Sequence, residues 1–172
     1  MTRLSLLLLL LVPAQAHQPT DLSAQTVIED STTSYAIYGH FETGDEVFKV
    51  LLDLPTDFAA PFEVLVPHRA KWAELRPAYA VVGPGLPAPT EDELSFLPEA
   101  PPEGWGVYVE RNDAAERYVI FESFARGVFW SSRPVAVPLM AGAAEIWVWS
   151  PEGDTGEVVM AFGVEESFGE EE

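Results

Sequence analysis

The stretch AAEIWVWSPEGDTGEVVMAFG, residues 143–163, decides the fold class that we predict for this chain. Its two ends, residues 144–149 and 157–162, are rich in the β-branched and aromatic side chains that favour strands. The loop between them, SPEGDTG, contains one proline and two glycines, which are typical of a tight turn. We therefore predict two strands joined by a hairpin turn.

Strand signals continue outward from this stretch, towards the N-terminus. Residues 68–76 have a helical composition, but Pro67 and Pro77 limit any helix there to one or two turns. We predict an all-β protein, an antiparallel β-sandwich or jelly roll of about eight to nine strands. The further strands are expected over residues 35–38, 46–53, 62–66, 78–82, 105–110, 117–122 and 135–139.

One connection is too long to be a plain turn. Residues 83–104 are rich in proline, glycine and acidic residues, and they show neither strand nor helix periodicity. Loops of this length inside a compact domain are uncommon and are often functional. We therefore predict one long Pro-rich loop beside the sandwich.

The N-terminus has the layout of a secretory signal peptide. Arg3 precedes an apolar run of nine residues, and Ala14-Gln15-Ala16 has the small-x-small form of a cleavage site. The alternative, a membrane anchor, needs about 20 apolar residues. We expect cleavage between Ala16 and His17 and an exported protein that is periplasmic, on the cell surface or secreted. The predicted divisions are a signal peptide (1–16), an N-terminal arm (17–32), the β-sandwich domain (33–164) and an acidic C-terminal tail (165–172).

Charge and composition exclude several functions. The chain has 28 Asp and Glu residues against 9 Lys and Arg, and its formal net charge of −19 repels nucleic acid and anionic membranes. It contains no cysteine, which excludes thiolate catalysis and cysteine-ligated metal sites. No Gly-x-Ser-x-Gly nucleophile motif occurs. We expect a binding or accessory module without catalytic activity.

Four aromatic residues are candidates for a binding surface. Trp147 and Trp149 are spaced i, i+2, so they share one face of their predicted strand, and Phe129 and Trp130 lie in the aromatic stretch FESFARGVFW. Exposed aromatic rings beside Asn, Glu and Arg would form a face for a glycan or a protein on the outer side of the membrane. The alternative is that the two tryptophans pack as core beneath residues 83–104.

Three histidines and two acidic loops are candidate metal ligands. After cleavage, His17 would offer its α-amino and imidazole nitrogens, and with His40 or His68 these would form a histidine brace for Cu(II). Asp154 lies in the loop SPEGDTG, and residues 91–93 are all acidic, so either loop could supply oxygen ligands to Ca²⁺. The alternatives are an unligated terminal histidine, a plain turn and a solvated acidic loop.

The order of these segments resembles a known family. GDEVFKVLLDLP (44–55), RPAYAVVGPGLP (76–87) and the opening stretch follow the layout of pre-peptidase C-terminal-like β-sandwich domains in secreted bacterial proteins. The motifs at residues 34–39, 83–87 and 155–168 are also similar to those of a group of uncharacterised exported bacterial proteins. The resemblance covers most of residues 34–168. It implies a β-sandwich and export, allows a Ca²⁺-stabilised accessory domain, and implies no activity.

Overall fold

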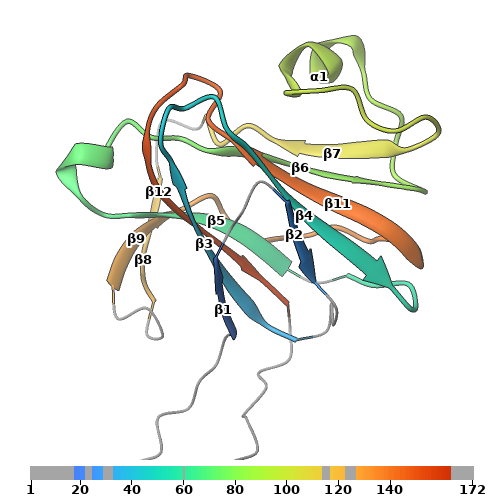
Figure 1. Cartoon of the computed structure of the whole chain (residues 1–172), viewed down its shortest axis with the longest axis horizontal. Coiled ribbons are helices and arrows are strands. Elements are labelled where there is room, and N and C mark those ends of the chain that lie inside the picture. The colour runs from blue at the N-terminus through green and yellow to red at the C-terminus, as the bar shows by residue number, and fades with distance from the viewer. Residues whose placement is uncertain are drawn as a thin grey trace, which may run out of the picture.

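The chain folds into two β-sheets that pack face to face (Figure 1). The computed structural model describes residues 18–21, 25–28, 33–59, 61–113, 117–122 and 127–163. The larger sheet has seven strands in the order β1-β3-β12-β5-β9-β8, with β10 beside β5, and the smaller sheet has five in the order β2-β4-β11-β6-β7. The predicted all-β sandwich is therefore confirmed.

Most strands lie where the sequence pattern predicts them. The larger sheet contains β1 (Gln18–Asp21), β3 (Tyr35–Phe41), β5 (Pro61–Pro67), β8 (Tyr118–Glu122), β9 (Gly127–Ser131), β10 (Val135–Ala136) and β12 (Gly156–Phe162). The smaller sheet contains β2 (Gln25–Ile28), β4 (Val47–Leu54), β6 (Ala78–Gly83), β7 (Gly106–Glu110) and β11 (Gly142–Trp149). The short helix η1 (Ala70–Trp72) lies between the prolines that limit its length.

The sandwich is held together by alternate side chains of both sheets. In β4, Phe48, Val50, Leu52 and Leu54 are buried, while the residues between them are at least partly exposed. This period of two is the pattern of a strand with one face against a core. The inter-sheet core consists mainly of aliphatic and aromatic residues from both layers, including Ile37, Phe41, Val64, Tyr79, Val81, Ile146, Val148, Val158 and Met160.

The described part of the chain contains twelve strands, more than the eight or nine predicted. The predicted N-terminal arm supplies β1 and β2, which pair in parallel with β3 and β4, so both sheets are mixed. In β2, Thr26 and Ile28 are buried and their neighbours are exposed. The sequence pattern of this polar segment gives only a weak strand signal, because an edge strand such as β2 depends largely on backbone pairing with its neighbour. The aromatic segment that contains Phe129 and Trp130 is also a strand, β9.

The predicted hairpin of residues 143–163 is wrong. β11 lies in the smaller sheet and β12 in the larger one, so the loop 150–155 crosses between the layers. The loop 42–46 makes the same crossing between β3 and β4, and the two crossing loops pack against each other at Gly44 and Gly153. A glycine-containing turn can join two strands of one sheet or two strands of different sheets. The alternation within a strand does not specify which other strand pairs with it.

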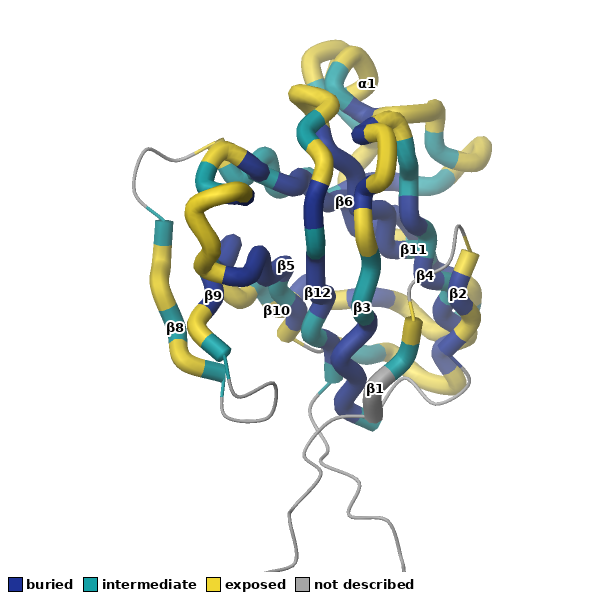
Figure 2. The backbone as a smooth tube through the Cα atoms, turned by 60° about the vertical axis from the view of Figure 1, so that its left-hand side comes forward, coloured by how far each residue is buried: buried dark blue, intermediate teal, exposed yellow. Residues whose placement is uncertain are grey.

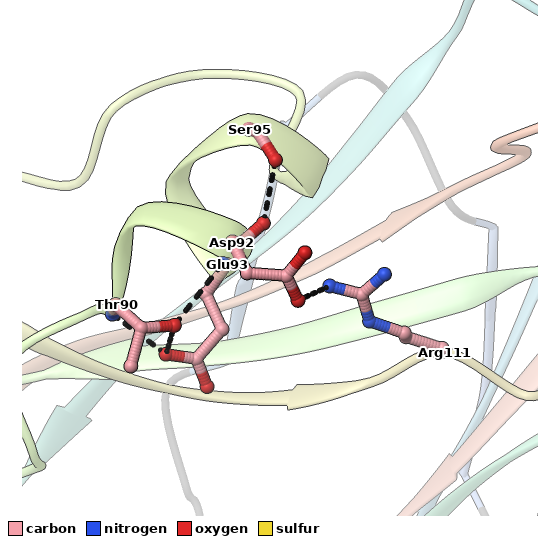
Figure 3. Close-up of polar contacts among 5 residues, drawn as sticks. All are labelled: Thr90, Asp92, Glu93, Ser95 and Arg111. Carbon is pink, nitrogen blue, oxygen red and sulfur yellow. Dashed lines mark hydrogen bonds and ion pairs between the residues drawn. The ribbon is translucent and has the colours of Figure 1, made fainter.

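The Pro-rich segment contains a helix that the composition concealed. Thr90 caps α1 (Glu91–Phe96): its hydroxyl accepts a hydrogen bond from the Glu93 amide at 3.2 Å, and the Glu93 carboxylate accepts one from the Thr90 amide at 2.8 Å (Figure 3). Thr-x-x-Glu is a capping-box signature that was present in the sequence. Asp92 forms an ion pair with Arg111. Residues 91–93 are thus the first turn of a helix, where acidic side chains are favourable.

Loss of this cap should loosen the helix. We expect Thr90→Ala to reduce the local stability of α1 by about 1 kcal/mol, measured by amide hydrogen exchange at residues 91–97. Ser95→Ala is the control, because Ser95 only donates to the Asp92 carbonyl within the helix and should change exchange less. Equal exchange in both variants would contradict the cap.

Acid should weaken the same cap. Hydrogen bonds from the Thr90 amide, and then from its hydroxyl, hold the pKa of Glu93 below its usual value. The stabilising contribution of this carboxylate is therefore complete above the pKa of an unfolded glutamate and is lost as the pH falls through the lower folded-state pKa. Exchange in α1 should accelerate over that interval in the wild type and much less in Glu93→Gln.

Candidate functional site

Trp147 and Trp149 are buried on the outer face of the smaller sheet. Trp147 is 0% exposed and Trp149 is 5% exposed. The Pro-rich segment covers them: the ring of Phe96 lies 5.4 Å from that of Trp149, and Leu97 belongs to the same apolar cluster. The Trp147 indole also donates a hydrogen bond to Glu145 at 2.6 Å. This burial favours the packing alternative, and neither ring presents a surface to a partner.

The candidate metal ligands are dispersed or lie outside the described residues. His40 is exposed on β3, His68 is exposed after β5, and Asp154 is partly exposed in the crossing loop. Within the described ranges, no group of three or more His, Asp or Glu side chains is placed to hold a metal ion. His17 lies outside those ranges, so the copper brace stays a prediction.

A pocket of about 530 Å³ lies on the outer face of the larger sheet, and we call it the outer-face pocket. Its floor belongs to a separate apolar cluster, in which Leu65, Phe129 and Val159 are 2%, 6% and 4% exposed. Four segments line it: Tyr38 and Gly39 of β3, Glu157 to Val159 of β12, Pro67 with His68 and Arg69, and Gly127 to Phe129 of β9.

Strand alternation positions the residues of the pocket. In β3, Ile37 and Phe41 point into the inter-sheet core, so Tyr38 lies on the outer face. In β12, Val158 and Met160 point inward, while Val159 joins the outer cluster, which places Glu157 on the outer face too. The ladders bring these residues together.

The outer face of the larger sheet is hollowed at the pocket, because residues of β3, β12 and β9 all line it. Burial raises the pKa of Tyr38, and so does the negative charge of Glu122. Glu122 lies on β8, four strands away from β3 in the sheet order. In Figure 2, β8 and β9 lie on one side of the larger sheet, apart from β12 and β3.

Charged and polar groups form the rim of the pocket. Arg69 Nη1 lies 3.6 Å from Glu157 Oε1, and the Arg69 guanidinium also stacks over Trp72 at 5.0 Å. The His68 ring packs against Trp130, with 4.4 Å between centroids, and its amide donates to the Val128 carbonyl at 2.8 Å. These contacts fix a guanidinium, a carboxylate and an imidazole above an apolar floor.

The pocket gathers several residues that the sequence nominated for different reasons. Phe129 and His68 line it, Trp130 supports His68, and His40 lies opposite Glu157 in the β3–β12 ladder. Sequence reasoning missed Tyr38, Arg69 and Glu157. Tyr38 and Glu157 lie in correctly predicted strands, but the pairing of β3 with β12 was not predictable, and nothing in the pattern marked Arg69.

The pocket combines an apolar floor with four polar or charged side chains, those of Tyr38, His68, Arg69 and Glu157. Because its pKa is raised, the Tyr38 phenol stays protonated at neutral pH and can donate a hydrogen bond. An apolar floor with a few fixed polar groups is the usual form of a small-ligand site, and the volume falls within the usual range of about 300–1,000 Å³.

No protein-family model matches the chain, and no curated protein matches its sequence. The resemblance to pre-peptidase C-terminal-like domains therefore stays a prediction. Within the part of the chain that the structure describes, no helix is long and apolar enough to cross a membrane.

Proposed function

We propose that this protein is a non-catalytic binding module that holds a glycan in the outer-face pocket. One observation carries the proposal: four chain segments converge to place a phenol, an imidazole, a guanidinium and a carboxylate around a buried apolar floor. This site replaces the tryptophan face of β11 as the binding surface.

The side chains of the pocket suit the two faces of a sugar ring. The C–H face of a pyranose is apolar and packs against aromatic and aliphatic side chains such as Phe129 and Val159. Its hydroxyl groups both donate and accept hydrogen bonds. Glu157 accepts, Arg69 donates, and the Tyr38 phenol does either. A protein partner would present a similar mixture, but a pocket of about 530 Å³ fits one or two sugar rings better than a protein surface.

The proposed setting is the outer side of the cytoplasmic membrane. The N-terminal pattern of residues 1–16 supports export, and the acidic charge of the chain suits a freely soluble domain after processing. Glycans of the cell envelope are available in that compartment.

The binding test uses the processed chain, residues 17–172, on an array of neutral and acidic oligosaccharides, followed by calorimetry with the best glycan. We expect Glu157→Ala and Tyr38→Phe each to weaken binding at least tenfold, because each removes a group that faces the sugar. Both side chains are partly exposed, so the melting temperature should change little.

Arg111→Ala is the matched control, because Arg111 forms its ion pair with Asp92 beside α1 and does not line the pocket. Its binding should equal that of the wild type. The proposal fails if no glycan on the array binds, or if Glu157→Ala and Tyr38→Phe both bind the best glycan as tightly as the wild type does.

A further inference from the structure

A second cavity, of about 500 Å³, opens where the edges of the two sheets meet, and we call it the polar cleft. The end of β7, at the edge of the smaller sheet, forms one side of it. The start of β8 and the end of β9, in the larger sheet, form the other side. Its walls include Glu110, Asn112, Arg117, Ser131, Ser132 and Arg133. It shares no lining residue with the outer-face pocket.

Arg117 carries a partly buried positive charge that forms no ion pair with a described residue. Its Nη1 donates to the Ala73 carbonyl at 3.0 Å, and its guanidinium packs over Trp130 at 4.5 Å. Its Nε is buried and has no hydrogen-bond partner, and no ion pair among the described residues includes it. Burial, and then the charge of Arg76, lowers its pKa to about 10, while the negative charge of Glu74 acts in the opposite direction. A partly buried charge that lacks a direct ion pair is stabilised when an anion joins it.

Close to the cleft wall lies a second buried polar group, the hydroxyl of Tyr79. Tyr79 is 0% exposed, and its hydroxyl has no hydrogen bond of normal geometry among the described residues. Burial raises its pKa, and the charges of Tyr108 and Glu110 add to this, while a side-chain hydrogen bond with Ser132 acts in the opposite direction. The hydroxyl therefore lies close to two wall residues of the cleft, Glu110 and Ser132, although Tyr79 itself does not line it. Buried polar groups are nearly always paired, so this donor can complete the hydrogen bonds of a ligand that reaches Ser132.

The rim of the cleft is held in an unusual backbone conformation. Asn112, with φ of 53°, and Arg133, with φ of 75°, are the two non-glycine residues with positive φ in the described ranges, and both line the cleft. The Arg133 amide donates to Ser131 Oγ at 3.2 Å, and its Nη2 donates to the Tyr118 hydroxyl at 2.5 Å. Such strain persists where the surrounding structure enforces it, often at binding sites. Here it holds a second guanidinium at the mouth of the cleft.

We infer that the polar cleft is a second binding site, for a small ligand that carries a carboxylate. A planar carboxylate can accept two hydrogen bonds from a guanidinium such as that of Arg117. Ser132 Oγ accepts a hydrogen bond from the Val64 amide at 2.9 Å, so its own hydroxyl proton is directed to the Tyr79 hydroxyl or to a ligand in the cleft. Glu110 in the wall, and Glu63, which pairs with Ser131, favour a singly charged ligand over a phosphate dianion. The inference does not rest on the glycan pocket.

The test measures binding of sodium D-glucuronate to the processed chain at neutral pH and constant ionic strength. D-glucose is the neutral counterpart, and inorganic phosphate and sodium chloride are the anion controls. We expect glucuronate to bind at least tenfold more tightly than any of the three and to raise the melting temperature. Arg117→Gln should weaken glucuronate binding at least tenfold, whereas Glu157→Ala, in the outer-face pocket, should leave it unchanged.

Tyr79→Phe gives a second readout that a purely structural role would not produce. Removing an unpaired buried hydroxyl should leave the melting temperature of the ligand-free protein unchanged or raise it, while glucuronate binding weakens at least threefold. This variant keeps the inference testable if Arg117→Gln does not fold.

Three results would each overturn the inference. The first is glucuronate binding no tighter than that of glucose, phosphate or chloride. The second is full glucuronate binding by Tyr79→Phe together with full binding by Arg117→Gln. The third is a loss of melting temperature in Glu74→Gln as large as that in Arg117→Gln, since Glu74 of the chain itself would then supply the anion.

Discussion

Trp147→Ala is expected to destabilise the domain by about 3–5 kcal/mol. The side chain is fully buried between β11 and the Pro-rich segment, in a cluster with Trp149, Val107 and Leu97. Truncation removes a large apolar surface and leaves a cavity that rigid strands cannot fill. The Glu145 carboxylate also loses the indole donor at 2.6 Å. Urea unfolding followed by circular dichroism measures the loss.

Phe121→Ala is the matched control for an aromatic truncation. Phe121 is 68% exposed on β8, so its removal should change stability by no more than about 0.5 kcal/mol. If Trp147→Ala stayed as stable as this control and lost glycan binding, β11 would be a ligand surface and its apparent burial would be misleading.

Gly44→Ala is expected to destabilise the domain by about 2–5 kcal/mol, for two reasons that add. Gly44 has φ of 85°, a conformation that costs a residue with a Cβ about 1–2 kcal/mol. An added Cβ would also lie 2.1 Å from the Gly153 carbonyl oxygen, so the two crossing loops would have to separate. Overpacking of this kind costs about 1–3 kcal/mol more. Equilibrium unfolding in urea again measures the change.

Gly153→Ala separates the two contributions. Gly153 has φ of 73°, but nothing lies within 4 Å of the Cβ position, so only the conformational cost of about 1–2 kcal/mol applies. The excess for Gly44→Ala then measures the packing of one crossing loop on the other. Equal losses in the two variants would mean that the loops do not pack as the structure shows.

The strands of the domain were largely predictable, but their partners were not. Alternation in β4 and β12 depends only on which side chains face the core, and that information is local. The assignment of β11 and β12 to different sheets depends on long-range pairing: β11 pairs with β4 and β6, and β12 with β3 and β5. A Gly-containing loop permits either outcome, and so the hairpin prediction failed.

The candidate sites show the same division. Phe129 and His68 were identifiable as unusual residues, but their common pocket exists only because β3, β12, β5 and β9 lie side by side in the larger sheet. The polar cleft was invisible in the sequence, since Tyr79 and Arg117 resemble an ordinary core residue and an ordinary surface residue. What distinguishes them is one buried polar atom in each, Arg117 Nε and the Tyr79 hydroxyl, for which no hydrogen-bond partner is found among the described residues, and this is a property of packing.

Composition and periodicity by themselves determined that this chain is an acidic all-β sandwich, because burial of one strand face requires an alternating pattern that any reader of the sequence can recognise. The pattern of residues 1–16 also predicts export. Only the tertiary structure decided which face of β11 is covered, which loops cross between the sheets and where polar groups converge. Those outcomes depend on contacts between residues far apart in the chain, and no local pattern encodes them.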